Sequence, residues 1–280
     1  MKTIKKLKPD EFRKMQLLQL DMILELDKVC REHNIKYTIS CGTLLGAVRH
    51  KGYIPWDDDA DITMLREDYE NFKKVANEMN PDICFFQDHT TDSEYLWEYG
   101  KLRRTNTVFI RVGQEHIKCK TGVAIDIFPL DDVPLSVIGQ ILQDFDCFIL
   151  RKILWAKVAE RNSQGIERII YSLLAKIPAS YVHKRVEDYS KKSNNTTPNR
   201  VRVLLFPSFG KLYLNTNPLS ERYSMPKKWF LERAEYDFEG KKVFGIKDYD
   251  SFLKYMYNDY MTLPPKAKRE PHALVSDFKF

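Results

Sequence analysis

Apolar side chains recur at helical spacing close to the start of the chain. Within residues 11–33 they lie three or four positions apart, at Met15, Leu18, Met22, Leu26 and Cys30. That period places them on one face of a helix, and Asn34 then provides a stop signal. The pattern therefore predicts a long amphipathic helix that packs its apolar face on a core.

Alternating or continuous apolar runs in the following hundred residues predict a set of short strands. These runs cover residues 35–40, 59–64, 83–87, 95–102, 107–112 and 123–128. Between the first two runs, residues 41–43 are expected to form a turn and residues 44–49 one or two helical turns. Residues 67–80 have the period of a helix. Strands that alternate with helical segments indicate α/β character for the first 130 residues.

The pattern changes after Pro134, where helical periodicity replaces the strand pattern. Residues 137–193 are predicted to be helical, with breaks near Gln164 and Gly165 and at Pro178. A polar, basic linker with the sequence SNNTTPNR follows.

The end of the chain returns to a mixed pattern, with short strands predicted at residues 203–206 and 238–244 and a helix at residues 249–257. The predicted fold class is α+β: a mixed β-sheet core flanked by helices, with a helical insertion or extension and a small C-terminal α/β segment. The predicted regions are the core at residues 1–135, the mostly helical region at 136–200 and the C-terminal segment, packed on the core, at 201–280.

Composition is that of a globular protein without a membrane span. Of the 280 residues, 43% are hydrophobic and 30% are charged, and no segment approaches the roughly 20 apolar residues that cross a bilayer. The first residues, MKTIKKLKPDEF, contain basic clusters without a following apolar stretch, so we expect no secretory signal and a cytoplasmic protein. The five cysteines lack CxxC spacing and are expected to be reduced, mostly buried thiols.

Basic residues exceed acidic residues by 45 to 39, which gives a formal net charge of +6. Such a surface suits nucleotides, polyanionic glycans or an acidic membrane face, so peripheral contact with the inner membrane surface is one expectation. Solvated helix faces are the other interpretation of the same clusters. Nucleic acid is not expected as a partner, because the charge does not gather in one stripe and the pI of 8.9 falls short of that of such domains.

The strongest candidate chemistry lies in the acidic run WDDDADIT. Asp57, Asp59 and Asp61 are spaced two apart, so on a strand their carboxylates share one face. Three carboxylates on one face repel one another unless solvent or a cation neutralises them. Hard oxygen ligands in this number favour Mg²⁺ or Mn²⁺ over Zn²⁺. The run therefore predicts a metal site, with a solvated acidic turn as the alternative.

The same spacing also matches the start of a calcium-binding EF-hand loop. That interpretation fails at the next positions, where Ile62 replaces the glycine of the turn and Asp68 replaces the usual bidentate glutamate. We therefore do not expect an EF-hand.

A further acid, Asp126, interrupts the apolar strand GVAIDIFPLDD. A buried carboxylate is costly without a partner, so Asp126 is expected to face a cation or a base. If its strand neighbours that of Asp59 and Asp61, three carboxylates converge. Asp131 and Asp132 stand close to the next proline and predict a turn or a helix start instead.

Glycine and basic residues near the acids indicate where a phosphate would bind. Gly42 and Thr43 lie between a predicted strand and a predicted helix, where backbone N–H groups attract phosphate and glycine lets a ligand approach. Lys101 and Arg103 alternate onto one face of a predicted strand, and their charges suit the phosphate oxygens of a donor. A basic strand edge is the alternative for this pair. One element that holds phosphate beside another that holds metal is the arrangement that phosphoryl transfer requires.

Three segments of the chain resemble the LicD family of phosphotransferases. YTISCGTLLGAVRHKGYIPWDDDADITMLREDYENF, at residues 37–72, closely resembles the hallmark of that family. GVAIDIFPLDDVP and the C-terminal YNDYMTLPPKAKREPHAL also resemble family segments, whereas residues 135–238 resemble the family only weakly. The resemblance therefore covers both ends of the chain.

That resemblance implies a fold and a set of roles. Family members are similar to nucleotidyltransferases of the polymerase-beta type, so residues 1–135 are expected to form a nucleotidyltransferase-like catalytic core. Gly42 and Thr43 are implied in phosphate binding. The implied catalytic acids, which would hold two Mg²⁺ or Mn²⁺ ions between them, are Asp59, Asp61 and Asp126.

The resemblance also implies a reaction. Well-known members transfer phosphocholine from CDP-choline onto sugars of teichoic acids, lipopolysaccharide or capsule, so the expected partners are a CDP-activated donor and a glycan or glycolipid acceptor. Aromatic faces hold a quaternary ammonium group. The candidates for that task, each with a core role as the alternative, are Trp56, Tyr95, Trp97 and Tyr99. His272 stands near a histidine of the family tail, and no role is assigned to it.

Other functions would use the same residues. A nucleotidyltransferase that modifies a small molecule needs the same acids but releases pyrophosphate in place of CMP. A metal-bound sugar-binding or scaffold protein without turnover is a second alternative, against which the presence of all three acids argues. A glycosyltransferase with a D-x-D motif is the third, and it gives the GTLLGA turn no obvious place.

Overall fold

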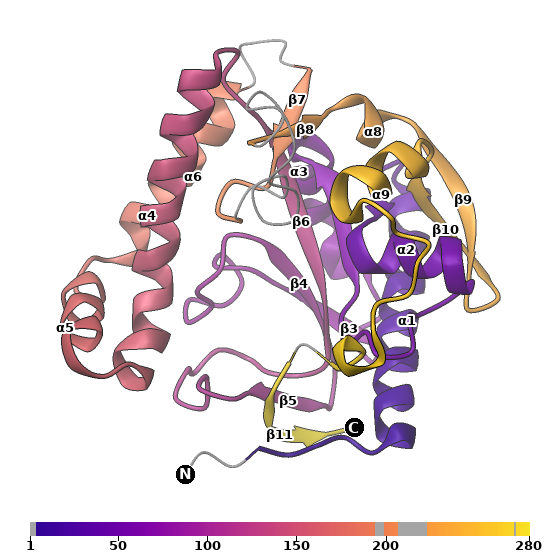
Figure 1. The fold of residues 1–280 in the computed structure, drawn as a ribbon, viewed down its shortest axis with the longest axis horizontal. Helices are drawn as coiled ribbons and strands as arrows, with labels where there is room; N and C mark the ends of the chain where they lie inside the picture. Colours follow the sequence, from indigo (N-terminus) through magenta and orange to yellow (C-terminus); the bar gives the residue numbers. More distant parts are fainter. Residues whose placement is uncertain (1–3, 194–198, 207–222, 272) are drawn as a thin grey trace. The chain divides into compact units, whose positions relative to one another are not determined.

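The computed structural model describes residues 4–193, 199–206, 223–271 and 273–280, and Figure 1 labels its elements. The helices are α1 (Pro9–Glu32), α2 (Cys41–His50), α3 (Arg66–Val75), α4 (Val137–Asn162), α5 (Gly165–Leu174), α6 (Ala179–Ser193), α8 (Lys228–Leu231) and α9 (Tyr249–Tyr257), with the 3-10 helices η1 (Ala76–Glu78) and η3 (Lys266–Lys268). The strands are β1 (Thr38–Ile39), β2 (Asp61–Leu65), β3 (Cys84–Gln87), β4 (Gly100–Arg104), β5 (Val108–Arg111), β6 (Ala124–Asp132), β7 (Arg200–Arg202), β8 (Met225–Pro226), β9 (Arg233–Phe238), β10 (Lys241–Ile246) and β11 (Val275–Lys279).

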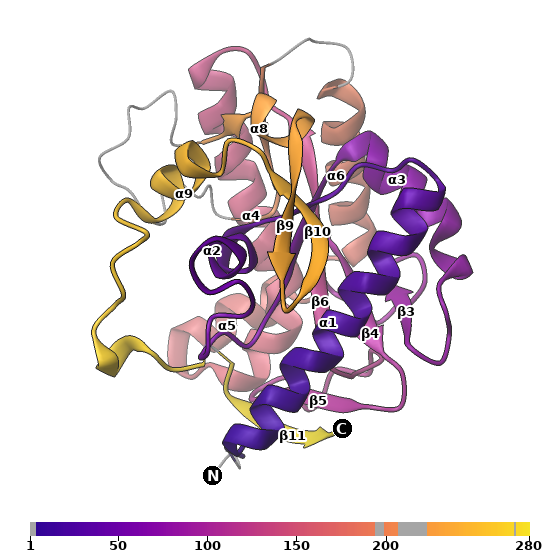
Figure 2. The same cartoon turned by 90° about the vertical axis from the view of Figure 1, so that its right-hand side faces the viewer.

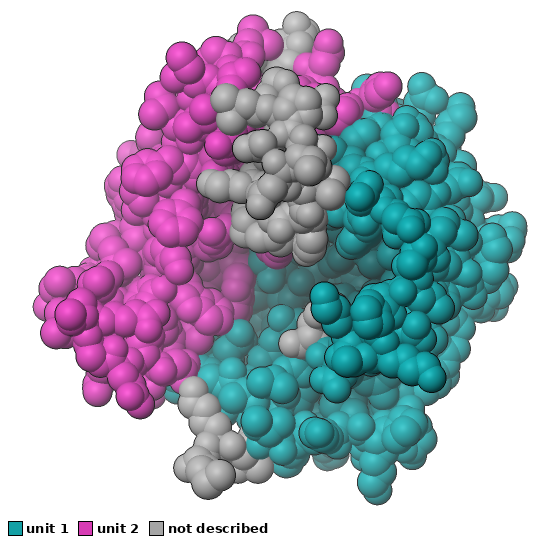
Figure 3. Space-filling model, viewed as in Figure 1, with its two compact units in different colours: residues 1–95, 99–129, 229–280 teal, residues 96–98, 130–228 magenta. Residues whose placement is uncertain are grey.

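The chain forms two compact units, which Figure 3 colours separately. Unit 1 contains residues 1–95, 99–129 and 229–280, and unit 2 contains residues 96–98 and 130–228. The candidate acids and the predicted phosphate-binding residues all belong to unit 1.

A mixed β-sheet flanked by helices forms the centre of unit 1, in agreement with the predicted mixture of helices and strands. Its strands follow the order β3, β4, β6, β2, β1, β10, β9. β1 pairs with β10 in parallel through Ile39 and Gly245, whereas the pairs β1–β2, β9–β10, β3–β4 and β4–β6 are antiparallel. The order places β6 directly between β4 and β2, so three segments that are distant in sequence lie side by side.

Helix α1 packs along this sheet because one of its faces is apolar over most of its length. Met22, Ile23 and Leu26 are fully buried, and the helix contacts β4 and β10 (Figure 2). Burial of each such side chain is worth about 1.5–3 kcal/mol relative to exposure. Pro9 occupies the start of the helix, where a missing N–H has no cost. The helix predicted at residues 11–33 is thus confirmed, with a slightly earlier start.

Unit 2 is mostly helical, as the pattern after Pro134 predicts. α4, α5 and α6 are separated at the predicted breaks, since α5 begins at Gly165 and α6 begins after Pro178. Leu150 of α4 and Val182 of α6 belong to one buried apolar cluster. The linker between this region and the end of the chain lies largely outside the described residues.

Several predicted strands have other bounds in the structure. The run at residues 95–102 becomes strand β4 only toward its end, and residues 203–206 form a turn after β7. The run at residues 238–244 is wrong as a single strand, because Glu239 and Gly240 adopt φ angles of 54° and 72° and reverse the chain between β9 and β10. Left-handed backbone of this kind closes tight hairpins.

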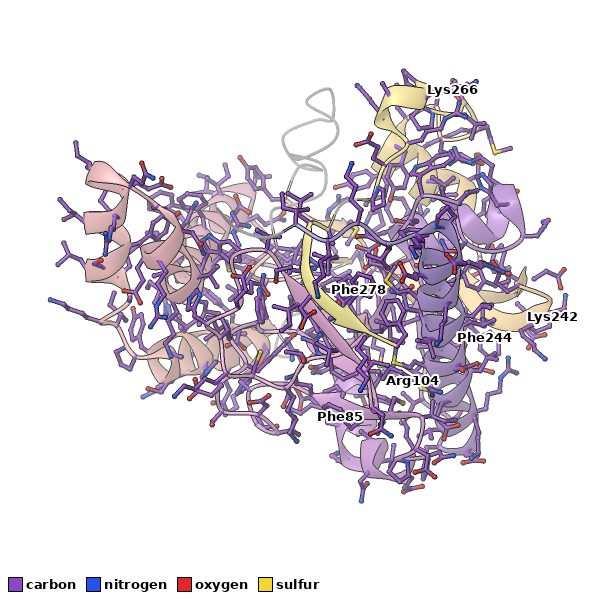
Figure 4. All side chains as sticks on the ribbon, turned by 90° about the horizontal axis from the view of Figure 1, so that it is seen from below. Phe85, Arg104, Lys242, Phe244, Lys266 and Phe278 are labelled. Carbon is purple, nitrogen blue, oxygen red and sulfur yellow. The ribbon has the colours of Figure 1, made fainter. Side chains whose placement is uncertain are left out.

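Long-range pairing accounts for two further differences. Asp131 and Asp132 lie in β6 and pair with β7, in place of the predicted turn or helix start. Strand β11 was not predicted; it pairs with β5, where Phe278, labelled in Figure 4, lies opposite Phe109. Neither pairing leaves a local pattern in the sequence, since each depends on a partner strand more than 60 residues away.

The cysteines are free thiols, four of them buried and Cys119 half-buried, as expected. Across the residues that the structure describes, no helix has both the length and the apolar character needed to cross a membrane.

Candidate active site

The acidic run forms a loop at residues 57–60, here called the acid loop, directly before β2. The strand predicted from residue 59 therefore begins only at Asp61. Asp57, Asp58 and Asp59 each place a carboxylate oxygen within 4.8 Å of the others. A loop lacks the two-residue alternation of a strand, so Asp58 joins the cluster although alternation excluded it. Carboxylates packed this closely repel one another and attract a cation.

Two buried glutamines of α1 hold the acid loop. Gln16 donates from Nε2 to the carbonyl oxygen of Asp57 at 3.0 Å. Gln19 donates from Nε2 to the carbonyl oxygens of Asp58, at 2.9 Å, and Ala124, at 3.2 Å, so it ties the loop to β6. Sequence reasoning missed both residues. The sequence did contain a signal for them, because two glutamines stand three positions apart on an otherwise apolar helix face.

Asp61 begins β2 next to the acid loop. Its backbone N–H donates to Oγ1 of Thr43 at 2.8 Å, so the hydroxyl of Thr43 fixes the start of the strand. Burial, followed by repulsion from Asp59 and Asp126, raises the pKa of Asp61 well above its usual range. Burial, followed by repulsion from Asp59, also raises the pKa of Asp57 to about 8. These acids therefore form one interacting group.

Asp126 meets the condition set by the sequence, because its strand β6 is the neighbour of β2. The backbone N–H of Asp126 donates to the carbonyl oxygen of Ala60 at 2.9 Å. Lys101 lies opposite Asp126 on β4 and donates from Nζ to its carboxylate. Burial lowers the pKa of Lys101 to about 8, while the charge of Asp126 acts in the other direction. The cation that Asp126 faces is thus Lys101.

The first turn of α2 lies against the acid loop. Because α2 starts at Cys41, Gly42 and Thr43 belong to the helix and not to the predicted turn. Cys41 itself has a φ of 48°. A Cβ atom on Gly42 would stand 2.5 Å from Oδ2 of Asp57, which is closer than real atoms come. Glycine therefore allows a carboxylate to approach the positive end of the helix. Phosphate binding by Gly42 and Thr43 stays a prediction.

Arg103 takes part in the sheet. Its side chain is buried, its Nε donates to Oε1 of Gln87 at 2.7 Å, and its Nη1 donates to the carbonyl oxygen of Gly122 at 2.9 Å. These bonds join β4 to β3 and to the segment before β6. They favour a structural role over the predicted contact with phosphate.

A basic residue that the sequence did not single out stands near the acids. Arg111 ends β5, and its side chain is exposed to solvent. Desolvation opposes its charge, but attraction by Asp126, and then by Tyr99, Asp58 and Asp59, raises its pKa. An exposed guanidinium in this position can bind phosphate oxygens. No local pattern marks Arg111, because only the folded chain brings β5 to the acids.

Three of the four aromatic candidates belong to unit 1, and Trp97 belongs to unit 2. Tyr95 is almost fully buried, which supports the alternative of a core role. The rings of Tyr95 and Tyr99 are 6.4 Å apart between centroids, and Nζ of Lys101 lies 5.1 Å from the centre of the Tyr99 ring. The ring of Tyr99 therefore already interacts with a cation of the protein.

Trp56, the remaining aromatic candidate, lines a pocket beside the acid loop. The pocket has a volume of about 480 Å³, and Phe12, Tyr53 and Trp56 contribute aromatic rings to its lining. Arg13 also lines it, with its guanidinium bonded to the carboxylate of Glu239 at 2.5 Å. The pocket thus combines aromatic walls with a cation whose charge is already paired.

The C-terminal tail also reaches the acids. The backbone N–H of Ala273 donates to Oδ2 of Asp58 at 2.7 Å, and β11 follows directly. The end of the tail segment that resembles the LicD family therefore contacts the acid loop. His272 lies outside the described residues.

Comparison with known proteins identifies relatives of this site. Residues 34–144, which include the acid loop, Lys101 and Asp126, match the family model described as LicD/FKTN/FKRP, nucleotidyltransferase domain. The chain is 27% identical over 274 residues to the lipopolysaccharide cholinephosphotransferase LicD of Haemophilus influenzae, a match that covers 93% of this chain and 95% of that protein. Uncharacterised proteins of Rickettsia typhi and Rickettsia prowazekii are 42% and 40% identical over 72 residues, which is 26% of this chain and 23% and 26% of those proteins.

Proposed function

Because the chain belongs to the LicD family of phosphotransferases, we propose that it moves a phospho-linked head group from a CDP-activated donor to a hydroxyl of a cell-surface glycan. The head group is phosphocholine and the acceptor is lipopolysaccharide, with teichoic acid or capsule as acceptors of the same chemistry. The observation that carries the proposal is the likeness, over almost the whole length, to a relative named for phosphocholine transfer to lipopolysaccharide. The core around the acids would have the nucleotidyltransferase-like fold of the family description.

The carboxylates fit a divalent cation such as Mg²⁺ or Mn²⁺. Asp57, Asp58 and Asp59 bring oxygens within 4.8 Å of one another, and repulsion contributes to the raised pKa values of Asp57 and Asp61. Oxygen donors alone favour hard cations. On the family resemblance we assign Asp59, Asp61 and Asp126 as the residues that would hold two ions, and the charges of Asp59 and Asp126 both act on Asp61. Bound ions would neutralise the pyrophosphate of the donor and the CMP that leaves.

The chain's own residues supply the remaining roles. Asp126 orients the acceptor hydroxyl and accepts its proton, as the hydroxyl oxygen bonds to the phosphorus of phosphocholine and the bond from that phosphorus to CMP breaks. Lys101 donates to Asp126 and keeps that carboxylate in place. Backbone N–H groups of Gly42 and Thr43 and the guanidinium of Arg111 hold the phosphate oxygens of the donor.

For the choline group we assign the pocket lined by Phe12, Tyr53 and Trp56. Cation–π attraction to aromatic faces is the means by which proteins hold quaternary ammonium groups. Trp56 directly precedes Asp57, so the pocket adjoins the acid loop along the chain.

The product released from each donor tests this proposal. With Mg²⁺ and lipopolysaccharide that lacks phosphocholine, the chain should release CMP fastest from CDP-choline, compared with CDP-ethanolamine, CDP-glycerol and CDP-ribitol. The double variant Asp59→Asn/Asp61→Asn serves as the control and should release none. Failure of the native chain to release CMP from every one of these donors would contradict the proposal.

Nucleotidyl transfer to a small molecule is the second candidate, and the nucleotidyltransferase domain in the family description favours it. That reaction releases pyrophosphate from a nucleoside triphosphate and leaves the nucleotide on the acceptor. Pyrophosphate release that depends on Asp59 and Asp61, without CMP release from any CDP donor, would replace the first proposal by this one.

A further inference from the structure

Helix α4 of unit 2 exposes a line of apolar side chains that the proposed reaction does not use. Ile138, Leu142, Phe145 and Ile149 are 72%, 63%, 63% and 38% exposed. Their spacing of four, three and four residues places them along one side of the helix. The side of α4 that carries Leu150 packs in the buried cluster with α6. The exposed line is therefore separate from the Leu150 face; farther along its own side of α4, Ala156 packs against Tyr171 of α5.

Helix α5 repeats this feature. Ile166, Ile169, Ile170 and Leu173 are 78%, 62%, 51% and 59% exposed and follow the i, i+3, i+4, i+7 spacing of a single helix face. Tyr171 alone is buried among the ten residues of α5, all of which the structure describes, and it packs against α4. Tyr171 lies about 140° around the helix from Ile166, so the apolar line points away from α4. Figure 1 shows α5 beside the C-terminal part of α4.

Basic side chains flank the α5 line and the C-terminal part of α4, whereas residues 137–150, which carry the α4 line, contain two acidic residues and no basic residue. Residues 151–178 contain six basic and two acidic residues. Lys157, Arg161, Arg168 and Lys176 are exposed to solvent. Long basic side chains can cover apolar surface with their stems while the charged ends reach anionic groups. The two apolar lines and these four basic residues together are called the α4–α5 surface below.

We propose that the α4–α5 surface docks the protein on the surface of an anionic phospholipid membrane. Contiguous exposed apolar side chains mark interaction sites. A helix with an Ile/Leu face and basic flanks lies in the headgroup region with its apolar side inward, and anionic lipid attracts the basic flanks. A second copy of the chain is a poorer occupant, because it would bring the same excess of basic residues against the surface. The inference does not rest on the proposed function, since docking needs neither donor nor acceptor.

Sedimentation with phospholipid vesicles tests the apolar part of the surface. The full chain should bind vesicles that contain phosphatidylglycerol and bind pure phosphatidylcholine vesicles far less. The variant Ile166→Asp/Ile170→Asp should bind at least about tenfold more weakly, because it removes two inserted apolar side chains. The matched control Leu17→Asp/Leu231→Asp changes two side chains of unit 1 that are 44% and 48% exposed, and it should bind like the native chain.

Charge reversal tests the basic part separately. Arg161→Glu/Arg168→Glu should weaken binding to phosphatidylglycerol vesicles severalfold and reduce its dependence on salt. The control Lys241→Glu/Lys266→Glu makes the same change of charge at exposed positions of unit 1 (Lys266 is labelled in Figure 4) and should have little effect. All four variants change exposed side chains, so equal thermal unfolding midpoints should show that the fold is kept.

Three results would overturn the inference. The first is that the native chain fails to bind phosphatidylglycerol vesicles. The second is that Ile166→Asp/Ile170→Asp binds them like the native chain. The third is that light scattering finds a native dimer, which this variant converts to a monomer. The last result would assign the α4–α5 surface to a second copy of the chain.

Discussion

Asp57 and Asp61 are buried acids whose pKa values are raised by burial and by their acidic neighbours. Such groups oppose folding whenever they ionise, because the unfolded chain holds the same charges in water and far apart. Side chains that fit their surroundings this poorly are typical of functional sites, where chemistry outweighs stability. These acids therefore carry a local electrostatic cost that a bound cation would remove.

Stability without metal should fall as pH rises. The pKa of Asp57 is about 8 in the folded chain against an ordinary value of 3.8, so between these values the folded state binds more protons than the unfolded state. Titration of Asp57 should therefore decrease the free energy of unfolding by up to about 1.4 kcal/mol per pH unit, with its contribution fully present below about pH 4 and lost toward about pH 8. Urea unfolding in a chelator across this range measures the decrease.

The variant Asp57→Asn is the control for that measurement, because it removes one of the two buried acids with a raised pKa and should make the decrease smaller, with Asp61 contributing the remainder. A free energy of unfolding that rises between about pH 5 and about pH 8 in the native chain would contradict the raised pKa of Asp57 in the folded state.

The pair Lys101–Asp126 permits a separation of structural and catalytic roles. Asp126→Asn leaves the ammonium of Lys101 buried without its charged partner, which should cost about 3–5 kcal/mol. Adding Lys101→Met should restore most of this stability, because both buried charges are then gone. If Asp126 acts in transfer, the double variant should still release CMP at least about 10²-fold more slowly than the native chain.

Urea unfolding and CMP release measure the two properties of these variants independently. A double variant that is stable and transfers at the native rate would leave Asp126 with a structural role only.

At the scale of elements, the site depends on how α1, α2, β4 and β6 surround one loop. α1 supplies Gln16 and Gln19 to its carbonyl groups, and the first turn of α2 adjoins Asp57 through Gly42. Helices were predicted well because their period extends over many residues, as in α1 and at the breaks that flank α5. Short strands were predicted less well, since β11 and the β9–β10 hairpin depend on pairing partners and on left-handed residues such as Glu239.

The contact between α1 and the acid loop predicts an effect of Gln19→Met on both stability and transfer. The variant keeps the length of the side chain but leaves the carbonyl oxygens of Asp58 and Ala124 without this donor, which should cost about 1–3 kcal/mol. The loop should then hold the acids less well, and CMP release should fall. Gln164→Met, at an exposed position, is the matched control.

Urea unfolding at constant pH and the CMP assay together check this effect. Native stability and native transfer in Gln19→Met would show that α1 does not position the acid loop.

At the scale of the whole molecule, the parts of the site that lie within one motif were predictable, and the parts that the fold assembles were not. Asp59, Asp61 and Gly42 share a stretch of 20 residues, so their spacing alone indicated metal and phosphate. Arg111 of β5 and Ala273 of the tail come close to the acids only in the folded chain, so no local pattern in the sequence marks them. The same holds for the α4–α5 surface, because a helical period predicts an apolar face without saying which neighbour covers it.

The fate of the two halves of CDP-choline tests the central claim most directly. CDP-choline labelled with ³H in cytosine and ¹⁴C in choline is incubated with the chain, Mg²⁺ and lipopolysaccharide that lacks phosphocholine. We expect ¹⁴C in the lipopolysaccharide and an equal amount of ³H in CMP, with neither transfer nor release by Asp59→Asn/Asp61→Asn. Both labels in the acceptor, or no transfer of ¹⁴C by the native chain, would contradict phosphocholine transfer at the acid loop.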